Sequence, residues 1–382
     1  MHITRWIAAA ALALLATTAR AEITIGVILS LTGPAASLGI PARQSIDLFP
    51  TTIGGEKVRM ISFDDGTDSS ATVRHAQKLV NDDKIDVLIG PSTSPTSIAI
   101  LDVIGRASTP MIAIAGSNAI IEPAEGSRRW AFKHAPSEAI QAKPIFDHFQ
   151  KQGGKTIAYV AVANAFGETW MKGTEEVAKA RGIRTVAVEK YSAADTSVTA
   201  QALKIIAANP DAVLIASFGT PGVLPIIELR NRGYKGLIYF NQGMANADVL
   251  RVGGKAMEGS LFPVAPVLVA EQLADDNPVK KVALEFIRVF EAKHGSGTRS
   301  LFGATAWDAY LLLNAAVPVA LKSGAKPGSV EFRTALRNAM ENVKNLVSTE
   351  GVYSFSEKDH NGADERAQVL VKVEGSKWVL VK

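Results

Sequence analysis

Short runs of β-branched and apolar residues alternate along the chain with segments of 3.6-residue apolar periodicity. This alternation is typical of βα units built around parallel sheets. In the first part of the chain, the runs predict strands at Ile23–Leu29, Val58–Phe63, Val87–Ile89 and Met111–Ala115. The intervening segments predict helices at Ala42–Phe49, Ala71–Val80 and Ile98–Ala107.

A second set of segments repeats the scheme. It predicts strands at Thr156–Val162, Thr185–Glu189, Ala212–Ala216 and Leu237–Phe240. It predicts helices at Glu168–Arg181, Val198–Ala207 and Val223–Asn231. The sequence therefore predicts two consecutive open α/β units of similar size.

The third part of the chain, about 267–345, has helical patterns and no strand signal. Its predicted helices are Val279–His294, Leu301–Lys322 and Ser329–Asn342, and they must complete one of the first two units. Strand patterns return at Val352–Phe355, Ala367–Val373 and Trp378–Val381. A chain that passes back and forth between two lobes produces this order, and a cleft between such lobes can close around a ligand.

Residues 1–21 are typical of a signal peptide, although a buried N-terminal helix is the alternative. Arg5 precedes an apolar run from Ile7 to Leu15, and Ala19-Arg20-Ala21 forms a small-x-small cleavage site. The run is too short to span a bilayer. The later apolar segment Ala304–Leu321 contains Trp307, Asp308 and Asn314, which indicates a core helix. We therefore expect an exported, soluble mature protein.

Composition and charge exclude several other classes of protein. The chain has 382 residues, of which 47% are hydrophobic, and it contains no cysteine. It is therefore neither disulfide-stapled nor a lipoprotein anchored through cysteine. The formal net charge is +4 and the basic residues are dispersed, so there is no footprint for nucleic acid.

The sequence lacks the common catalytic and metal-binding motifs. No metalloprotease, nucleophile-elbow, dinucleotide or P-loop pattern occurs, and the six histidines are scattered. The acidic stretch Asp64–Asp68 resembles a calcium loop, but the required spacing is absent. A turn with Asp68 as a helix cap is the favoured interpretation. We expect no cofactor, no metal and no enzymatic activity.

Two loops that follow predicted strands are rich in hydroxyl groups. They are 90–97, which follows Val87–Ile89, and 115–118, which follows Met111–Ile114. Both lead into helices, where free backbone N–H groups and hydroxyls suit a ligand carboxylate. Ordinary helix capping explains the same residues equally well.

Several motifs in order make the chain resemble the leucine/isoleucine/valine-binding family, the periplasmic receptors of branched-chain amino-acid-type ABC importers. The resemblance covers essentially all of the mature chain. The motifs are Ile25-Gly26-Val27, Leu31-Thr32-Gly33-Pro34, Phe63-Asp64-Asp65, Ile89-Gly90-Pro91 with Ser94, Ala165-Phe166-Gly167 and Ala304-Thr305-Ala306-Trp307-Asp308-Ala309.

The resemblance implies two doubly wound α/β lobes joined by a three-stranded hinge, with the ligand enclosed between them. It implies a first lobe of 22–136 plus 265–347 and a second of 137–264 plus 348–382. It further implies a carboxylate site at Ser94, Ala115 and Ser117. Phe166, Phe218 and Phe302 fall where the family places side chains that line the cleft, with core packing as the alternative.

Two departures from the family pattern change the expected ligand. The position of the acidic residue that neutralises a ligand ammonium holds Gln242, and Leu38 stands where an aromatic residue is common. A neutral amide cannot balance a buried ammonium. We therefore expect an aromatic or other hydrophobic carboxylate without an α-amino group, with Gln242 or Asn241 bonded to a distal hydroxyl. Glu168 or Asp195 would instead serve an ammonium if either lies in the cleft.

The leading interpretation is a periplasmic receptor that closes around its ligand and delivers it to an ABC permease at the inner membrane. A branched-chain amino-acid receptor and a ligand sensor of the same fold are the alternatives. An exported enzyme would require an acid, a base or a nucleophile converging on the cleft.

Overall fold

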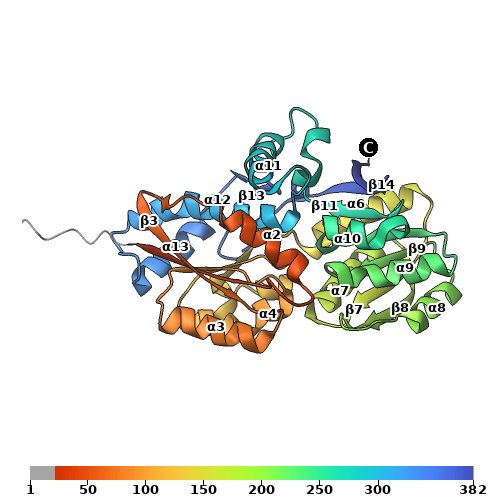
Figure 1. Cartoon of the computed structure of the whole chain (residues 1–382), viewed down its shortest axis with the longest axis horizontal. Helices are drawn as coiled ribbons and strands as arrows, with labels where there is room; N and C mark the ends of the chain where they lie inside the picture. The colour runs from red at the N-terminus through yellow and green to blue at the C-terminus, as the bar shows by residue number, and fades with distance from the viewer. Residues whose placement is uncertain (1–21, 382) are drawn as a thin grey trace, which may run out of the picture.

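The computed structural model describes residues 22–381 and contains two large β-sheets, each flanked by helices (Figure 1). The signal peptide expected at residues 1–21 lies outside the described residues. We call the six-stranded sheet with its packed helices the first lobe, and the seven-stranded sheet with its helices the second lobe. In Figure 1 the first lobe lies on the left and the second on the right.

The sheet of the first lobe consists of β1 (Ile23–Leu29), β2 (Thr52–Ile53), β3 (Glu56–Asp64), β4 (Val87–Ile89), β5 (Met111–Ala113) and β6 (Ala131–Lys133). Their order is β2-β3-β1-β4-β5-β6, and every pairing except β2–β3 is parallel. All seven residues of β1 are buried. Helices cover both faces of a parallel sheet, which is why β1 is a continuous apolar run rather than an alternating one.

The helices between these strands are α2 (Ala36–Ile46), α3 (Ser69–Asn81), α4 (Ser94–Ala99), α5 (Leu101–Arg106) and the 3₁₀ turns η1 (Asn118–Ile120) and η2 (Gly126–Trp130). The Asp68 carboxylate caps α3 by accepting from the Ala71 N–H at 2.6 Å. Asp64 accepts from the Leu31 and Gly66 N–H groups, which closes the turn. The acidic stretch is thus a turn and a cap, as expected.

The sheet of the second lobe consists of β7 (Thr156–Val162), β8 (Arg184–Tyr191), β9 (Ala212–Ala216), β10 (Leu237–Phe240), β11 (Leu261–Val264), β14 (Val369–Glu374) and β15 (Lys377–Leu380). Their order is β15-β14-β11-β10-β9-β7-β8. At one edge β14 pairs antiparallel with β11, and β15 pairs antiparallel with β14.

The helices of the second lobe are α6 (Glu138–Lys151), α7 (Ala165–Ala180), α8 (Thr199–Ala207), α9 (Val223–Asn231), α10 (Ala247–Gly253) and the 3₁₀ turns η3 (Thr220–Gly222), η4 (Gln242–Met244) and η5 (Gly254–Met257). Helix α6 packs against α7, β11 and β14.

The last part of the chain contains η6 (Pro266–Gln272), α11 (Lys280–His294), α12 (Leu301–Leu321), α13 (Val330–Glu341), β12 (Leu346–Val347), β13 (Val352–Tyr353) and η7 (Glu365–Ala367). Helix α12 packs against α2 and α13, and α11 also contacts α2. These helices therefore lie on the first lobe, although most of the second lobe precedes them in sequence.

Within residues 22–381, α12 is long and apolar enough to cross a membrane by length and composition. More than half of its most apolar stretch is buried inside the protein. Since it packs between α2 and α13, it is a core helix of the first lobe, as its interrupting polar residues predict.

Most of the predicted strands and helices are confirmed to within a few residues. The predicted helix 98–107 is in fact two short helices, α4 and α5, which are separated at Ile100. Strands β6 and β11 and helices α6 and α10 have no sequence prediction. The strands are only three or four residues long, α10 has seven, and Pro144 interrupts the periodic pattern of α6.

Three segments run between the lobes. They follow β6, β11 and β13, at 134–137, 265–279 and 354–368. The Asn361 side chain of the third segment donates to the carbonyl of Lys133, at the end of β6, at 3.1 Å and to that of Ala135 in the first segment at 3.0 Å. Tyr353 donates to the His134 carbonyl at 3.0 Å. These bonds tie the first and third crossings together.

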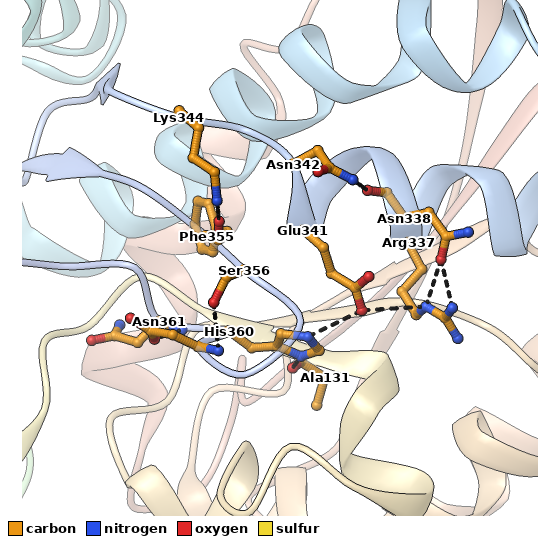
Figure 2. Close-up of polar contacts among 11 residues, drawn as sticks. Ala131, Arg337, Asn338, Glu341, Asn342, Lys344, Phe355, Ser356, His360 and Asn361 are labelled. Carbon is orange, nitrogen blue, oxygen red and sulfur yellow. Dashed lines mark hydrogen bonds and ion pairs between the residues drawn. The ribbon is translucent and has the colours of Figure 1, made fainter.

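A buried charged cluster lies beside these crossings (Figure 2). Nδ1 of His360 lies 2.9 Å from the Ala131 carbonyl oxygen, and its Nε2 lies 3.3 Å from a Glu341 carboxylate oxygen. The same oxygen lies 3.5 Å from Arg337 Nε, and the Arg337 guanidinium stacks over the Trp130 ring. The cluster connects α13 of the first lobe to the third crossing.

Candidate functional site

A cavity lies between the lobes, where the carboxyl ends of β4, β5, β9 and β10 converge. The cavity and its mouth together enclose about 590 Å³ of space. The volume open to the centres of water molecules is about 50 Å³, compared with about 10–15 Å³ for a single water. The cavity therefore suits a small molecule. Its lining residues are Leu38, Ser92, Thr93, Ser94, Pro95, Ile114, Ala115, Gly116, Ala135, Gln141, Phe166, Phe218, Asn241, Gln242, Gly243, Leu301, Phe302 and Thr305.

Apolar side chains from both lobes form the walls of the cavity. Leu38 comes from α2, Phe166 from the start of α7, Phe218 from the loop after β9, and Phe302 from the start of α12. Each is largely buried, yet each lines the cavity. The aromatic residues are therefore core residues and wall residues at the same time.

Hydroxyl groups from the loop after β4 form the polar part of the first-lobe wall. Gly90 makes the tight turn, because its φ is +99° and a Cβ there would lie 2.0 Å from the Ile28 carbonyl oxygen. Thr93 caps α4 by accepting from the Thr96 N–H. Ser94 Oγ accepts from the Ser117 N–H at 3.2 Å, which leaves the Ser94 hydroxyl hydrogen to donate to a ligand.

Ser117 itself differs from the expectation, since it is not among the lining residues. Its hydroxyl accepts from the Ala119 N–H and lies 2.8 Å from Thr169 Oγ1 of α7. Next to it, the Asn118 N–H donates to Glu138 Oε1 of α6 at 3.1 Å. These bonds join the lobes beside the cavity, so the structure has the lobes closed.

Amide side chains form the polar part of the second-lobe wall. Gln242 Oε1 accepts from Gln368 Nε2 at 2.5 Å, and Asn241 Oδ1 accepts from the Ser217 N–H at 2.8 Å. Gln141 Oε1 accepts from the Gln242 N–H at 3.2 Å and from Trp170 Nε1 at 3.4 Å. The acceptor oxygens of these amides are thus engaged within the protein.

Within residues 22–381, no charged side chain lines the cavity. The two acids considered as partners for an ammonium lie elsewhere. Glu168 pairs with Lys190 at 3.0 Å, and the Asp195 carboxylate accepts from the Ser192 N–H. The described part of the chain, residues 22–381, contains no group of three or more His, Cys, Asp or Glu side chains that would hold a metal ion.

Sequence reasoning did not single out several lining residues. Gln141 lies on the unpredicted helix α6, and Ser92 and Thr93 lie in a loop for which only Ser94 was selected. Thr305 belongs to the Ala304–Ala309 motif. It lies in the first turns of a helix that Ser300 caps, and this position could have indicated that it faces the ligand site.

Behind Thr305 lies a buried pair of carboxyl groups, Glu350 and Asp308. Thr305 Oγ1 lies 3.0 Å from both Glu350 oxygens and 3.0 Å from the Leu301 carbonyl oxygen. Asp308 accepts from the N–H groups of Thr349 and Glu350. A hydroxyl has one hydrogen, so a protonated Glu350 can donate from one of its oxygens to Thr305 while Thr305 donates to the Leu301 carbonyl.

Burial raises the pKa of Asp308 to about 7. Burial, followed by the charge of Asp308, raises the pKa of Glu350 well above its usual range. In the unfolded chain both groups lose their protons near about pH 4. The folded protein thus keeps protons that the unfolded chain releases between about pH 4 and 7. The contribution of the pair to the free energy of unfolding falls as the pH rises through this window.

Glu350→Gln is expected to remove the part of this pH dependence that comes from Glu350, because the introduced amide does not titrate and its N–H can still donate to Thr305. Between about pH 5 and 7.5, the wild type should lose on the order of 2 kcal/mol more unfolding free energy than the variant. Urea unfolding at both pH values measures this. Burial lowers the pKa of His134 to about 3, which makes stability fall as the pH falls, but this contribution cancels between the two proteins. Parallel pH profiles would contradict the prediction.

The fold and the cavity define a class of protein, a two-lobed α/β binding protein that encloses a small molecule between its lobes. The chain belongs to the periplasmic binding protein family, a family of solute-binding receptors, whose model matches residues 22–377. A Leu/Ile/Val-binding protein homologue of Brucella melitensis is 24% identical over 349 residues, which are 90% of this chain and 89% of the homologue.

Solved structures agree with this assignment. An extracellular ligand-binding receptor from Rhodopseudomonas palustris HaA2 is 39% identical, with a TM-score of 0.91 over 94% of this chain and 100% of that one. A leucine-binding protein from Thermotoga maritima is 20% identical, with a TM-score of 0.80 over 94% and 98%. A solute-binding protein of an ABC transporter from R. palustris BisB5, in complex with 3,4-dihydroxybenzoic acid, is 21% identical, with a TM-score of 0.78 over 94% and 96%. The last two show the fold alone.

Proposed function

We propose that the protein is a periplasmic receptor of an ABC importer and that it binds an aromatic carboxylate lacking an α-amino group. The observation that carries this proposal is the uncharged cavity, with aromatic walls and amide side chains whose oxygens are already engaged. A buried ammonium without a counter-charge costs several kcal/mol. An amino acid is therefore a poor ligand for this lining.

A benzoate or phenylpropenoate fits the arrangement of the walls. The carboxylate lies at Ser94 and the backbone at Ala115, the ring lies among Phe166, Phe218 and Phe302, and the distal group reaches Asn241 and Gln242. Helix α4 has only six residues, so the Ser94 hydroxyl rather than a helix dipole supplies the main donor. The dihydroxybenzoate of the R. palustris BisB5 protein belongs to the same ligand class.

Ligand contacts with both lobes favour the closed state. Residues 1–21 direct export to the periplasm and are removed there. A permease at the inner membrane receives the ligand, and the protein carries out no chemical reaction on it.

The first test is a thermal-shift measurement on ligand-free protein beginning at Glu22. The matched pair is 3-phenylpropanoate and phenylalanine, which differ by the α-amino group alone. A ligand present at 100 times its Kd adds about 2.7 kcal/mol of stability. We expect 3-phenylpropanoate, benzoates and 4-hydroxycinnamate to raise the melting temperature, and phenylalanine, leucine and valine to leave it unchanged.

Stabilisation by leucine or valine would overturn the ligand class in favour of a branched-chain amino-acid receptor. Recovery of chemically altered ligand would overturn the receptor assignment in favour of an enzyme. Uptake of the labelled acid by cells lacking the gene separates transport from sensing. Lost uptake supports an importer, whereas normal uptake overturns it in favour of a sensor.

A further inference from the structure

Gln368 lies directly behind the cavity wall without being part of its lining. It is the residue before β14 in the third crossing segment, and it is buried. Its Nε2 donates to Gln242 Oε1 at 2.5 Å and to the carbonyl oxygen of Ala367 at 2.8 Å. Among the hydrogen bonds within residues 22–381, the Gln368 side chain reaches the cavity lining through Gln242.

The Ala367 carbonyl fixes the orientation of both amides. A carbonyl oxygen can only accept, so the Gln368 atom facing it must be the nitrogen. That nitrogen also faces Gln242, so the Gln242 atom that meets it must be the oxygen. The remaining polar atom of Gln242, its Nε2, is then the one available to the cavity that Gln242 lines.

A second amide on the same wall, that of Asn241, is also held by its oxygen. The Ser217 N–H can only donate, so it holds Asn241 by its oxygen. Asn241 Nδ2 is buried and has no hydrogen-bond partner within residues 22–381. A buried donor without a partner is costly unless a ligand supplies an acceptor. Both amides of this wall are therefore held by their oxygens, and no hydrogen bond within residues 22–381 engages their N–H groups.

We propose that Gln368 is a positioning residue that holds Gln242 with its N–H groups toward the ligand. It thereby selects ligands whose distal group accepts a hydrogen bond, such as a hydroxyl, ether or carbonyl oxygen, over those with a protonated amine. This inference rests on the proposed function, since it concerns the distal end of an aromatic carboxylate. It assigns the discrimination to a residue outside the cavity.

The experiment compares two benzoates of the same shape, 4-(hydroxymethyl)benzoate and 4-(aminomethyl)benzoate. The first carries an oxygen acceptor and the second a protonated amine at the same position. Calorimetric titration of the wild type is expected to give at least about a 100-fold preference for the hydroxymethyl compound. In Gln368→Met the Gln242 amide is free to turn its oxygen to the amine, so the preference should fall at least about 10-fold.

Gln201→Met on helix α8, where the Gln201 amide donates to the Lys190 carbonyl at the surface, is the matched control and should keep the wild-type ratio. A purely structural role for Gln368 would weaken both ligands equally and leave the ratio unchanged.

The outcomes separate the inference from the function on which it rests. Binding of the hydroxymethyl compound with the same ratio in wild type and Gln368→Met overturns the inference and leaves the proposed function intact. Failure of the wild type to bind 4-(hydroxymethyl)benzoate, benzoate and 3-phenylpropanoate overturns both.

Discussion

Gln242→Glu is expected to lower the affinity for 3-phenylpropanoate by about 100-fold or more, the largest effect on binding that we predict. The introduced carboxylate would still accept from Gln368 Nε2, and its second oxygen would replace the Gln242 N–H groups at the cavity. It would add an unpaired negative charge to a wall without charged residues, beside an anionic ligand. Breaking a buried polar arrangement in this way costs about 3 kcal/mol or more, which is a factor of at least about 100 in Kd.

The same substitution is expected to create a site for an ammonium group. 4-(Aminomethyl)benzoate carries its ammonium at the distal end, beside position 242, and the wild type should bind it poorly; it gains a counter-charge in Gln242→Glu. Calorimetric titration of both ligands against both proteins makes the comparison, with Gln201→Glu on the surface of α8 as the control for charge alone. Equal affinity of wild type and Gln242→Glu for 3-phenylpropanoate would mean that Gln242 does not face the ligand.

The parts of the fold that the sequence predicts are those in which local patterns and burial agree. The run Ile23–Leu29 is buried on both faces of the sheet, so its apolar pattern alone identifies the strand. Helix α6 shows the opposite situation. It carries Pro144, and its buried residues include Glu138 and Gln141, so its polar positions do not mark a solvent face. Such a helix is specified by packing against β11 and β14 rather than by periodicity.

The site residues likewise differ in how far the sequence predicts them. Ser94 belongs to the loop region that follows β4, and the carboxyl ends of parallel strands are where ligands lie, so the strand pattern points to it. Asn241 and Gln242 were assigned through the resemblance to the family. Gln141 and Gln368 reach the site from segments that are distant in sequence, and only the folded chain brings them to Gln242. Ser117 follows a strand as well, but closure of the lobes places its hydroxyl against Thr169.

The ligand cavity and the hinge share elements of the chain. Helix α12 contributes Phe302 and Thr305 to the cavity, and Thr305 contacts Glu350, which follows the β12 strand. The third crossing holds Asn361 against the first crossing and ends at Gln368, behind the ligand wall. The third crossing therefore joins the lobes and, through Gln368, also orients the Gln242 amide that we propose to bind the ligand.

Glu341→Ala is expected to cause the largest loss of stability, about 3 kcal/mol in the free energy of unfolding. It would remove the carboxylate that lies 3.5 Å from Arg337 Nε and 3.3 Å from His360 Nε2, all on buried side chains. Nδ1 of His360 must donate to the Ala131 carbonyl, so the other ring nitrogen, Nε2, is the one that faces the Glu341 carboxylate. Removing one partner of a buried pair leaves the other charge uncompensated, which costs about 3–5 kcal/mol.

Exposed pairs provide the matched comparison, because ion pairs in water contribute about 0–1 kcal/mol. Glu285 bonds Arg288 at 2.6 Å on the surface of α11, and Glu285→Ala should change the unfolding free energy by less than about 0.5 kcal/mol. Glu341→Gln should fall between the two alanine variants, since its amide can still bond His360 but carries no charge for Arg337. Urea unfolding of the ligand-free proteins measures all three. If Glu341→Ala unfolds at the same urea concentration as Glu285→Ala, the hinge does not depend on this cluster.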